Sequence, residues 1–132
     1  MPRQSWTIPA EPQQVSRLRR EVVSFAAAQG VSDPPIADLK IAVSEAMTNV
    51  IVHAYGGDHA GKVDVLVSVE PGREITVVVA DAGSGMNPRA DSPGMGLGLP
   101  LIGNLADSLQ ISTPAGGHGT EVRMSFALPA GR

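Results

Sequence analysis

The strongest constraint on the fold of this chain is a pair of strand-like segments joined by a short turn. Residues 63–69 carry valine at every second position, which is the pattern of a strand with one buried face. Residues 75–80 form a run rich in β-branched side chains that ends at Asp81, as expected of a central, well-buried strand. The Pro-Gly-Arg-Glu connection at residues 71–74 has the length of a hairpin turn. The core of the protein is therefore expected to form against these two strands.

Two segments with helical spacing of apolar residues precede this hairpin. The first helix is expected over residues 11–29, where Gly30 suits its C-terminal end. The second begins at the Asp33-Pro-Pro sequence and runs to about residue 54. Its buried stripe is predicted to consist of Ile36, Leu39, Val43, Ala46, Met47, Val50 and Ile51.

The remaining segments complete a single α+β domain. Residues 5–9 predict a short edge strand, residues 97–106 a third helix, and residues 109–112 and 120–128 two further strands. The order β-α-α-β-β-α-β-β, without a linker or an internal repeat, is typical of one domain over residues 1–132. Helices packed on one face of a mixed, mainly antiparallel β-sheet form the simplest architecture for this order, an α+β two-layer sandwich.

Composition narrows the functional classes. Charged residues make up 17% and hydrophobic residues 42% of the chain, which is the balance of a globular rather than a disordered protein. The formal net charge of −3 argues against direct, sequence-independent binding to nucleic acid. The absence of cysteine excludes disulfides, thiolate catalysis and cysteine-based zinc sites. No apolar run is long enough to span a bilayer and no signal-peptide pattern is present, so we expect a cytoplasmic protein without a membrane partner.

Arg17, Arg19 and Arg20 form a local basic cluster on the first predicted helix. The cluster has two interpretations: the solvated face of a helix, or a contact surface for an acidic partner. A charge reversal that leaves partner affinity unchanged would exclude the second interpretation.

Glu45, Asn49 and His53 lie at i, i+4 and i+8 on the second predicted helix, so they share one stripe beside the apolar one. An Asn carboxamide oxygen is a hard, neutral ligand that suits Mg²⁺. A Glu one turn earlier can orient or deprotonate a hydroxyl or a water. Taken alone, the three residues also fit an ordinary amphipathic helix with polar side chains at its boundary.

Two glycine-containing motifs follow the hairpin. Asp81 at the strand end can accept a hydrogen bond from an exocyclic amine such as adenine N6, and Gly83 and Gly85 leave room for a ring against the backbone. An ordinary strand-to-loop turn has the same composition. The glycines at positions 94, 96 and 98 open the third predicted helix, where backbone N–H groups and the helix dipole attract phosphates. They match neither a Walker A loop nor a dinucleotide-binding fingerprint.

The order and spacing of these motifs, together with Gly119-Thr120, resemble the ATP-binding domain shared by gyrase, heat-shock-90 chaperones, histidine kinases and the mismatch-repair MutL protein. Residues 43–55, Val-Ser-Glu-Ala-Met-Thr-Asn-Val-Ile-Val-His-Ala-Tyr, are very similar to the corresponding helix of anti-sigma-factor serine kinases. The whole chain fits that small single-domain family. The resemblance therefore implies a histidine-kinase-like ATPase fold that binds ATP and Mg²⁺.

The resemblance also implies a role for each motif residue. Glu45 would be the catalytic general base toward a serine hydroxyl, Asn49 would ligate the Mg²⁺ held by the ATP phosphates, and Asp81 would bind adenine N6 with assistance from Thr120. The glycines at 94, 96 and 98 would surround the phosphates, and His53 would support the pocket wall. The predicted ATP-binding set is Asn49, His53, Asp81, Gly83, Gly85, Met86, Gly94, Met95, Gly96, Leu97, Gly98 and Thr120.

The family assignment carries an expected function and expected partners. In that family the kinase phosphorylates an anti-sigma-factor antagonist, a small domain with an acceptor serine, and this frees the kinase to hold a sigma factor. Family members commonly form homodimers, and we expect one here. One departure favours an alternative: residues 86–93, between the glycine motifs, are only eight residues long with Arg89 as the single cation. Since stabilising a transferring phosphoryl group normally requires cations, a non-catalytic ATP- or ADP-binding regulatory module stays open as the second hypothesis.

Overall fold

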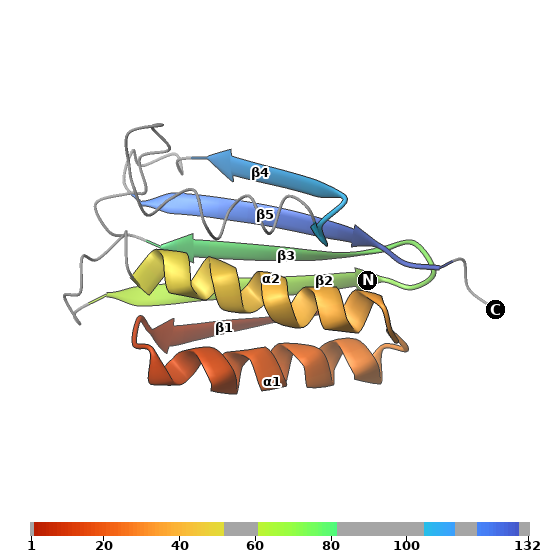
Figure 1. Ribbon diagram of the computed structural model, residues 1–132, viewed down its shortest axis with the longest axis horizontal. Helices are drawn as coiled ribbons and strands as arrows, with labels where there is room; N and C mark the ends of the chain where they lie inside the picture. Colours follow the sequence, from red (N-terminus) through yellow and green to blue (C-terminus); the bar gives the residue numbers. More distant parts are fainter. Residues whose placement is uncertain (1, 52–60, 82–104, 113–118, 130–132) are drawn as a thin grey trace.

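Within the residues that the structure describes, two helices cover one face of a five-stranded sheet (Figure 1). The computed structural model describes residues 2–51, 61–81, 105–112 and 119–129. Its elements are β1 (Arg3–Pro9), α1 (Gln13–Ala28), α2 (Pro35–Asn49), β2 (Lys62–Glu70), β3 (Glu74–Asp81), β4 (Ser108–Ser112) and β5 (Thr120–Ala127). The strand order is β1-β2-β3-β5-β4, and all four neighbouring pairs are antiparallel. The predicted α+β two-layer fold is confirmed, and the sheet is antiparallel throughout its described strands rather than mixed.

The predicted hairpin forms the centre of the sheet. Val65 of β2 lies opposite Val79 of β3, and β3 pairs on its other side with β5. In the turn, the Arg73 N–H donates to the Glu70 carbonyl at 2.9 Å. Gly72 has a φ of 74°, in the left-handed region that glycine adopts without steric cost. The central position expected for the Ile75–Asp81 segment is therefore confirmed.

The two helices begin and end close to the positions that their sequence predicts. α1 stops just before Gly30, whose φ of 88° marks a typical helix end. At the start of α2 the backbone N–H of Ala37 donates to the Asp33 carboxylate at 3.2 Å. N–H groups of the first turn have no partner within the helix, so this side chain satisfies one of them. Residues 50–51 continue α2 as a wider, π-type turn. The predicted extension to residue 54 and nearly all of the helix expected over residues 97–106 lie outside the described residues.

The core lies between the helices and the sheet. Alternate residues of β2, β3 and β5 point toward the helices and are buried, while the residues between them stay partly exposed on the other face. Among the described residues, Phe126 is the only aromatic side chain in the buried core. Aliphatic side chains therefore supply most of the burial, at about 1.5–3 kcal/mol for each fully buried one. The predicted stripe of α2 is buried from Ile36 to Val50, with Ile51 partly buried.

The edge strand β1 is attached to α1 by Trp6. Its indole Nε1–H donates to the Glu21 carboxylate at 2.9 Å, and its ring meets Phe25 edge-to-face with centroids 6.4 Å apart. The short edge strand expected over residues 5–9 is thus confirmed, with two further residues at its start. Neither helix in the described part of the chain has the length and apolar composition needed to cross a bilayer.

Candidate functional site

Three polar side chains are buried at one end of the sheet. Asn49, Asp81 and Thr120 are 5%, 5% and 2% exposed, and they are the buried polar residues of the part of the chain that the structure describes. Such residues are informative because the interior of a domain is otherwise apolar and polar groups are costly to place there. All three belong to the predicted ATP-binding set.

The register of the sheet places Asp81 directly opposite Thr120. Asp81 is the last residue of β3 and Thr120 the first of β5, and both continue the buried, helix-facing series of their strands. Gly119, with a φ of 82°, brings the chain into β5 from a left-handed conformation, which explains the glycine of the Gly119-Thr120 motif. Opposite residues of an antiparallel pair have Cβ atoms about 4.5–5.5 Å apart. A carboxylate and a hydroxyl therefore lie side by side at this end of the sheet.

Asn49 approaches the same end of the sheet from the helical layer. Figure 1 shows the C-terminal end of α2 at the end of the sheet where β3 ends and β5 begins, and α2 contacts both strands. The side-chain Nδ2 of Asn49 is buried and makes no hydrogen bond within the described residues. Leaving a buried polar group unsatisfied costs about 1–3 kcal/mol. An unpartnered amide in a buried position is the arrangement expected where a ligand supplies the missing contact.

The amide of Asn49 also fits the predicted role of a Mg²⁺ ligand. A carboxamide carries its oxygen and nitrogen at nearly equivalent positions, so a rotation about its terminal bond presents the oxygen where the unpartnered nitrogen lies. Amide oxygens, phosphates and waters are the ligands that Mg²⁺ prefers. The side chain present here is therefore compatible with the predicted metal.

Glu45 lies one helical turn before Asn49 and is half-buried. The α-helix rises 1.5 Å per residue, so the two Cα atoms are separated by about 6 Å along the axis of α2. A carboxylate at the boundary between the core and solvent can accept a proton from a hydroxyl that approaches from outside. Glu45 thus lies beside the apolar stripe of α2, as its spacing predicts, and its catalytic role stays a prediction.

The other predicted site residues lie outside the described residues. They are His53, Gly83, Gly85, Met86, Gly94, Met95, Gly96, Leu97 and Gly98. Residues 86–93, which carry the argument for a non-catalytic module, also lie outside them.

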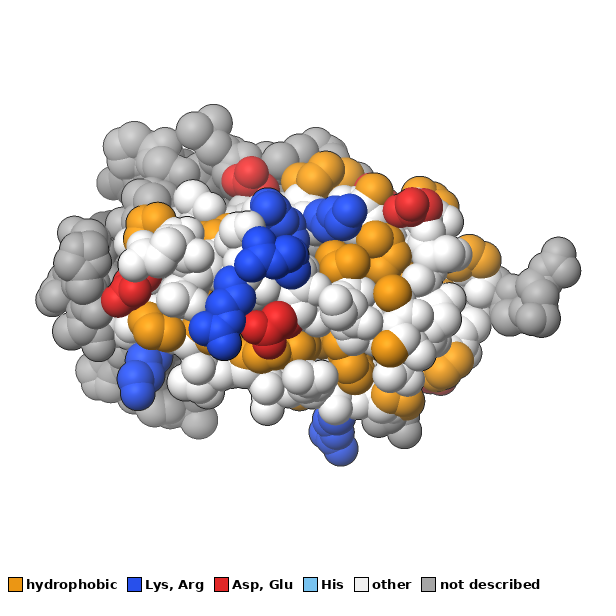
Figure 2. All heavy atoms as spheres, turned by 90° about the horizontal axis from the view of Figure 1, so that it is seen from below, with side chains coloured by type: hydrophobic (Ala, Val, Ile, Leu, Met, Phe, Trp, Pro, Cys, Tyr) orange, Lys and Arg blue, Asp and Glu red, His pale blue; other side chains and the backbone are white. Residues whose placement is uncertain are grey.

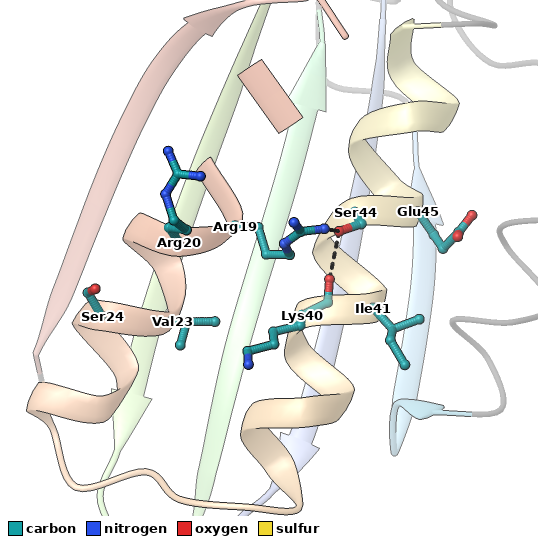
Figure 3. Close-up of a pocket in the computed structure, with 8 residues that line it drawn as sticks. All are labelled: Arg19, Arg20, Val23, Ser24, Lys40, Ile41, Ser44 and Glu45. Atoms are coloured by element: carbon teal, nitrogen blue, oxygen red, sulfur yellow. Dashed lines mark hydrogen bonds between the residues drawn. The ribbon is translucent and has the colours of Figure 1, made fainter. Parts of the chain in front are cut away.

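A groove between α1 and α2 was not predicted from the sequence. This α1/α2 groove has a volume of about 670 Å³, and Glu45 lies at its margin. The signal in the sequence was Ile41, an apolar residue off the buried stripe of α2 that lies one turn before Glu45 in the same i, i+4 series. The groove is lined by Arg19, Arg20, Val23, Ser24, Lys40, Ile41, Ser44 and Glu45 (Figure 3).

Comparison with known proteins identifies the family of this chain. Residues 8–126 match the family described as histidine kinase-like ATPase domain. The chain is 34% identical to the serine-protein kinase RsbW of Bacillus licheniformis, over 82% of this chain and 76% of that one. It is 33% identical to the anti-sigma F factor of Clostridium acetobutylicum, over 90% of each chain.

A solved structure supports the fold independently. The structure of the RsbU and RsbW domains of a Mycobacterium tuberculosis protein superimposes with a TM-score of 0.74 at 22% identity, covering 99% of this chain and 34% of that one. At this identity the likeness concerns the fold alone. The sequence match over most of the domain carries the relationship: the chain belongs to the histidine kinase-like ATPase domain family, and within it to the group of the RsbW serine-protein kinases and anti-sigma F factors.

Proposed function

We propose that this protein is an ATP- and Mg²⁺-dependent serine kinase that phosphorylates an anti-sigma-factor antagonist and sequesters a sigma factor. The observation that carries the proposal is the burial of three polar residues. Asn49 lies at the end of α2, and Asp81 and Thr120 lie at the same end of the sheet. The names of the relatives, serine-protein kinase RsbW and anti-sigma F factor, support the two halves of this function.

The sheet end supplies the nucleotide-binding part. The Asp81 carboxylate accepts a hydrogen bond from the adenine N6 amine, and the Thr120 hydroxyl beside it adds a second polar contact, directly or through a water. Both contacts form in a position shielded from water, where a hydrogen bond to a charged group contributes about 1.5–3 kcal/mol. The glycines at 94, 96 and 98 are proposed to surround the phosphates through their backbone N–H groups.

The end of α2 supplies the groups for phosphoryl transfer. Asn49 would hold the metal through its amide oxygen, and Mg²⁺, when bound, would neutralise charge on the phosphates. Glu45 accepts the proton of the acceptor serine hydroxyl as the serine oxygen forms its bond to the γ-phosphorus. The bond between that phosphorus and the bridging oxygen breaks, and ADP leaves with the bond's electron pair. Removal of a positioned general base of this kind typically lowers a rate by about 10²–10⁴-fold.

The proposed partners follow from the two activities. An unphosphorylated antagonist and a sigma factor compete for the kinase, so phosphorylation of the antagonist favours sequestration of the sigma factor and lowers transcription. We propose that the protein works in the cytoplasm as a homodimer.

The second candidate function is a non-catalytic module that signals through ATP or ADP occupancy. The short segment over residues 86–93, with Arg89 as its single cation, favours this candidate. The two functions share the nucleotide site and differ in whether a phosphoserine forms.

One experiment distinguishes the kinase from the non-catalytic module. The protein is incubated with Mg-ATP and the antagonist encoded in the same genome, and the antagonist is then analysed by intact-mass spectrometry. We expect a gain of one phosphate with the wild-type protein. Glu45→Gln should bind nucleotide normally and transfer phosphate about 10²–10⁴-fold more slowly. The control is Glu74→Gln, because Glu74 is a half-buried carboxylate at the opposite end of β3 from Asp81.

Each result has a defined consequence. Nucleotide binding without any phosphoserine would replace the kinase by the non-catalytic module. Transfer by Glu45→Gln at the wild-type rate would remove Glu45 from the mechanism.

A further inference from the structure

One hydrogen bond joins the two helices next to the proposed catalytic carboxylate. The guanidinium of Arg19 on α1 reaches across to α2 and donates from Nη1 to the Ser44 hydroxyl at 3.1 Å (Figure 3). Within the described ranges it is the only hydrogen bond between α1 and α2. Ser44 comes directly before Glu45 in the sequence. The polar link between the helices therefore lies at the residue that precedes the proposed general base.

Both ends of this bond are themselves held in place. The Ser44 hydroxyl donates to the Lys40 carbonyl of the preceding turn at 2.8 Å, which leaves its oxygen free to accept from Arg19. The other terminal nitrogen of Arg19, Nη2, donates to the Ser16 hydroxyl on its own helix at 3.4 Å. Arg19 and Ser44 are both half-buried. The planar guanidinium thus joins a hydroxyl on each helix in a defined direction.

The rest of the contact between the helices is apolar. Both α1 and α2 contribute buried aliphatic side chains to one core, and the two helices pack against each other. Apolar burial has no preferred direction, so it holds the helices together but defines a small rotation of one helix less sharply. A hydrogen bond weakens steeply when its angle is distorted. We therefore expect the Arg19–Ser44 bond to fix the rotation of α2 relative to α1.

A small rotation of α2 would displace the Glu45 carboxylate by a chemically important distance. A helix with its side chains is about 10–12 Å across, so the end of a side chain lies about 5–6 Å from the axis. A rotation of about 10° moves an atom at that radius by about 1 Å. Misplacing a group by about 1 Å can lower a catalysed rate by about 10²-fold. The efficiency of a base at Glu45 therefore depends on the orientation of α2.

The three arginines of the predicted basic cluster have different contacts. Arg17 forms an ion pair with a carboxylate of its own helix, Arg20 donates to a serine of its own helix, and Arg19 crosses to α2. Seen from the side on which α1 lies, Lys and Arg side chains gather on the surface (Figure 2), and Arg20 and Lys40 line the same groove as Arg19. Arg19 is therefore distinguished from its neighbours by its hydrogen bond to α2 rather than by its charge.

We propose that Arg19 and Ser44 are positioning residues for phosphoryl transfer. Their hydrogen bond fixes the rotation of the part of α2 that carries Glu45, and so holds the carboxylate where it accepts the proton of the acceptor serine. Both residues act through Glu45. The inference rests on the proposed function, and it assigns a role in that reaction to a contact between the helices, outside the nucleotide site.

The test compares variants that break the bond with matched variants that leave it intact. Arg19→Gln and Ser44→Ala each remove one partner, and the double variant removes both. Arg20→Gln is the control for Arg19→Gln, because it makes the same change in charge in the same groove and leaves the bond between the helices in place. Ser44→Thr is the rescue variant, because Thr48 already donates to the carbonyl four residues earlier on α2, at 2.8 Å.

The first measurement is steady-state phosphoryl transfer to the antagonist encoded in the same genome. We expect Arg19→Gln, Ser44→Ala and the double variant to lower kcat by a similar factor of about 10–100, because each of them removes the same bond. The KM for the antagonist and the affinity for ATP should stay within about threefold of the wild type. Arg20→Gln and Ser44→Thr should keep kcat within about threefold.

The second measurement needs neither nucleotide nor antagonist. NMR of the protein alone records the backbone amide shifts of residues 45–49, which lie on the helix opposite the substituted arginine. These amides should shift in Arg19→Gln, because α2 has lost its contact with α1. They should stay as in the wild type in Arg20→Gln.

The inference is overturned if Arg19→Gln keeps the kcat and the amide shifts of the wild type, or if Arg20→Gln changes them equally. A change confined to KM would make Arg19 a contact of the protein substrate and would also overturn it. Losses that multiply in the double variant would contradict a role through one shared bond. If the wild type transfers no phosphate, the proposed function fails and this inference fails with it, whereas normal transfer by every variant overturns this inference alone.

Discussion

Replacing Asn49 by leucine should make the unliganded protein more stable and at the same time abolish its response to ATP. Asn49 is 5% exposed at the end of α2, and its Nδ2 makes no hydrogen bond among the described residues. Leucine, which has the same branched shape and number of side-chain heavy atoms, removes the unsatisfied group and extends the apolar surface of Met47 and Val50, its buried neighbours on α2. If Asn49 instead stabilised the fold, its replacement by leucine would lower the stability of the unliganded protein.

The magnitude follows from three contributions. Removing a buried, unsatisfied amide group is favourable by about 1–3 kcal/mol. Leucine also has a higher helix propensity than asparagine, by a few tenths of a kcal/mol. The change of shape in a packed core costs up to about 1.5 kcal/mol. The net expected gain in the free energy of unfolding is about 1–2 kcal/mol, which corresponds to roughly 3–8 °C in Tm for a domain of this size.

Thermal and urea unfolding measure both the stability without ligand and the stabilisation by ATP. The wild type and Asn49→Leu are each unfolded with and without Mg-ATP. ATP at about 100 times its Kd should stabilise the wild type by about 2.7 kcal/mol and should leave the variant unchanged. Thr48→Leu is the control, because Thr48 is exposed on the neighbouring position of α2, and it should keep the ATP shift. A loss of stability in Asn49→Leu without ligand, or an ATP shift equal to that of the wild type, would refute the assignment of Asn49 to the ligand.

Two further predictions concern the strands and the core. Asp81→Asn should weaken ATP binding at least about tenfold, because the charge-assisted hydrogen bond to the adenine amine would become a neutral one. Fluorescence titration with a labelled ADP measures this affinity, and an unchanged value would show that Asp81 does not bind the base. Leu39→Ala, at a position with 0% exposure, should lower the free energy of unfolding by about 2–5 kcal/mol in urea titrations while the folded protein still binds ATP. A loss below about 1 kcal/mol would contradict the packing of α2 on the sheet.

The order of the described strands and helices could be predicted because each of these segments has a clear local pattern. The alternating valines of β2, the turn at Gly72 and the Asp33 start of α2 are all short-range signals, and the structure confirms them. No short-range signal in the sequence shows which strands are neighbours in the sheet. In the structure β5 lies between β3 and β4. Its pairing with β3, which places Thr120 opposite Asp81, joins segments that are far apart in the sequence and is seen only in the structure.

The sequence predicts the residues of the candidate site but not how they are arranged in space. Asn49, Asp81 and Thr120 could be identified from their motifs, yet nothing in the motifs shows that all three are buried at one place. The α1/α2 groove could not be found from periodicity, because its cations come from two helices whose packing is a tertiary property. Spacing alone makes Arg17, Arg19 and Arg20 one cluster, whereas the contacts of Glu21 and Ser44 divide it.

The two unusual surfaces of α2 depart from the expected pattern of polar and apolar residues in opposite directions. At its C-terminal end a polar side chain, Asn49, occupies a core position, and one helical turn before Glu45 an apolar side chain, Ile41, is left exposed. The buried amide costs stability in the free protein, so it is expected to persist where a bound ligand supplies its missing contact. Glu45 lies one helical turn before Asn49, so its carboxylate is on the same face of α2 as the proposed metal ligand. This arrangement places the proposed general base and the proposed metal ligand on one helix, so their spacing is set by the helix itself.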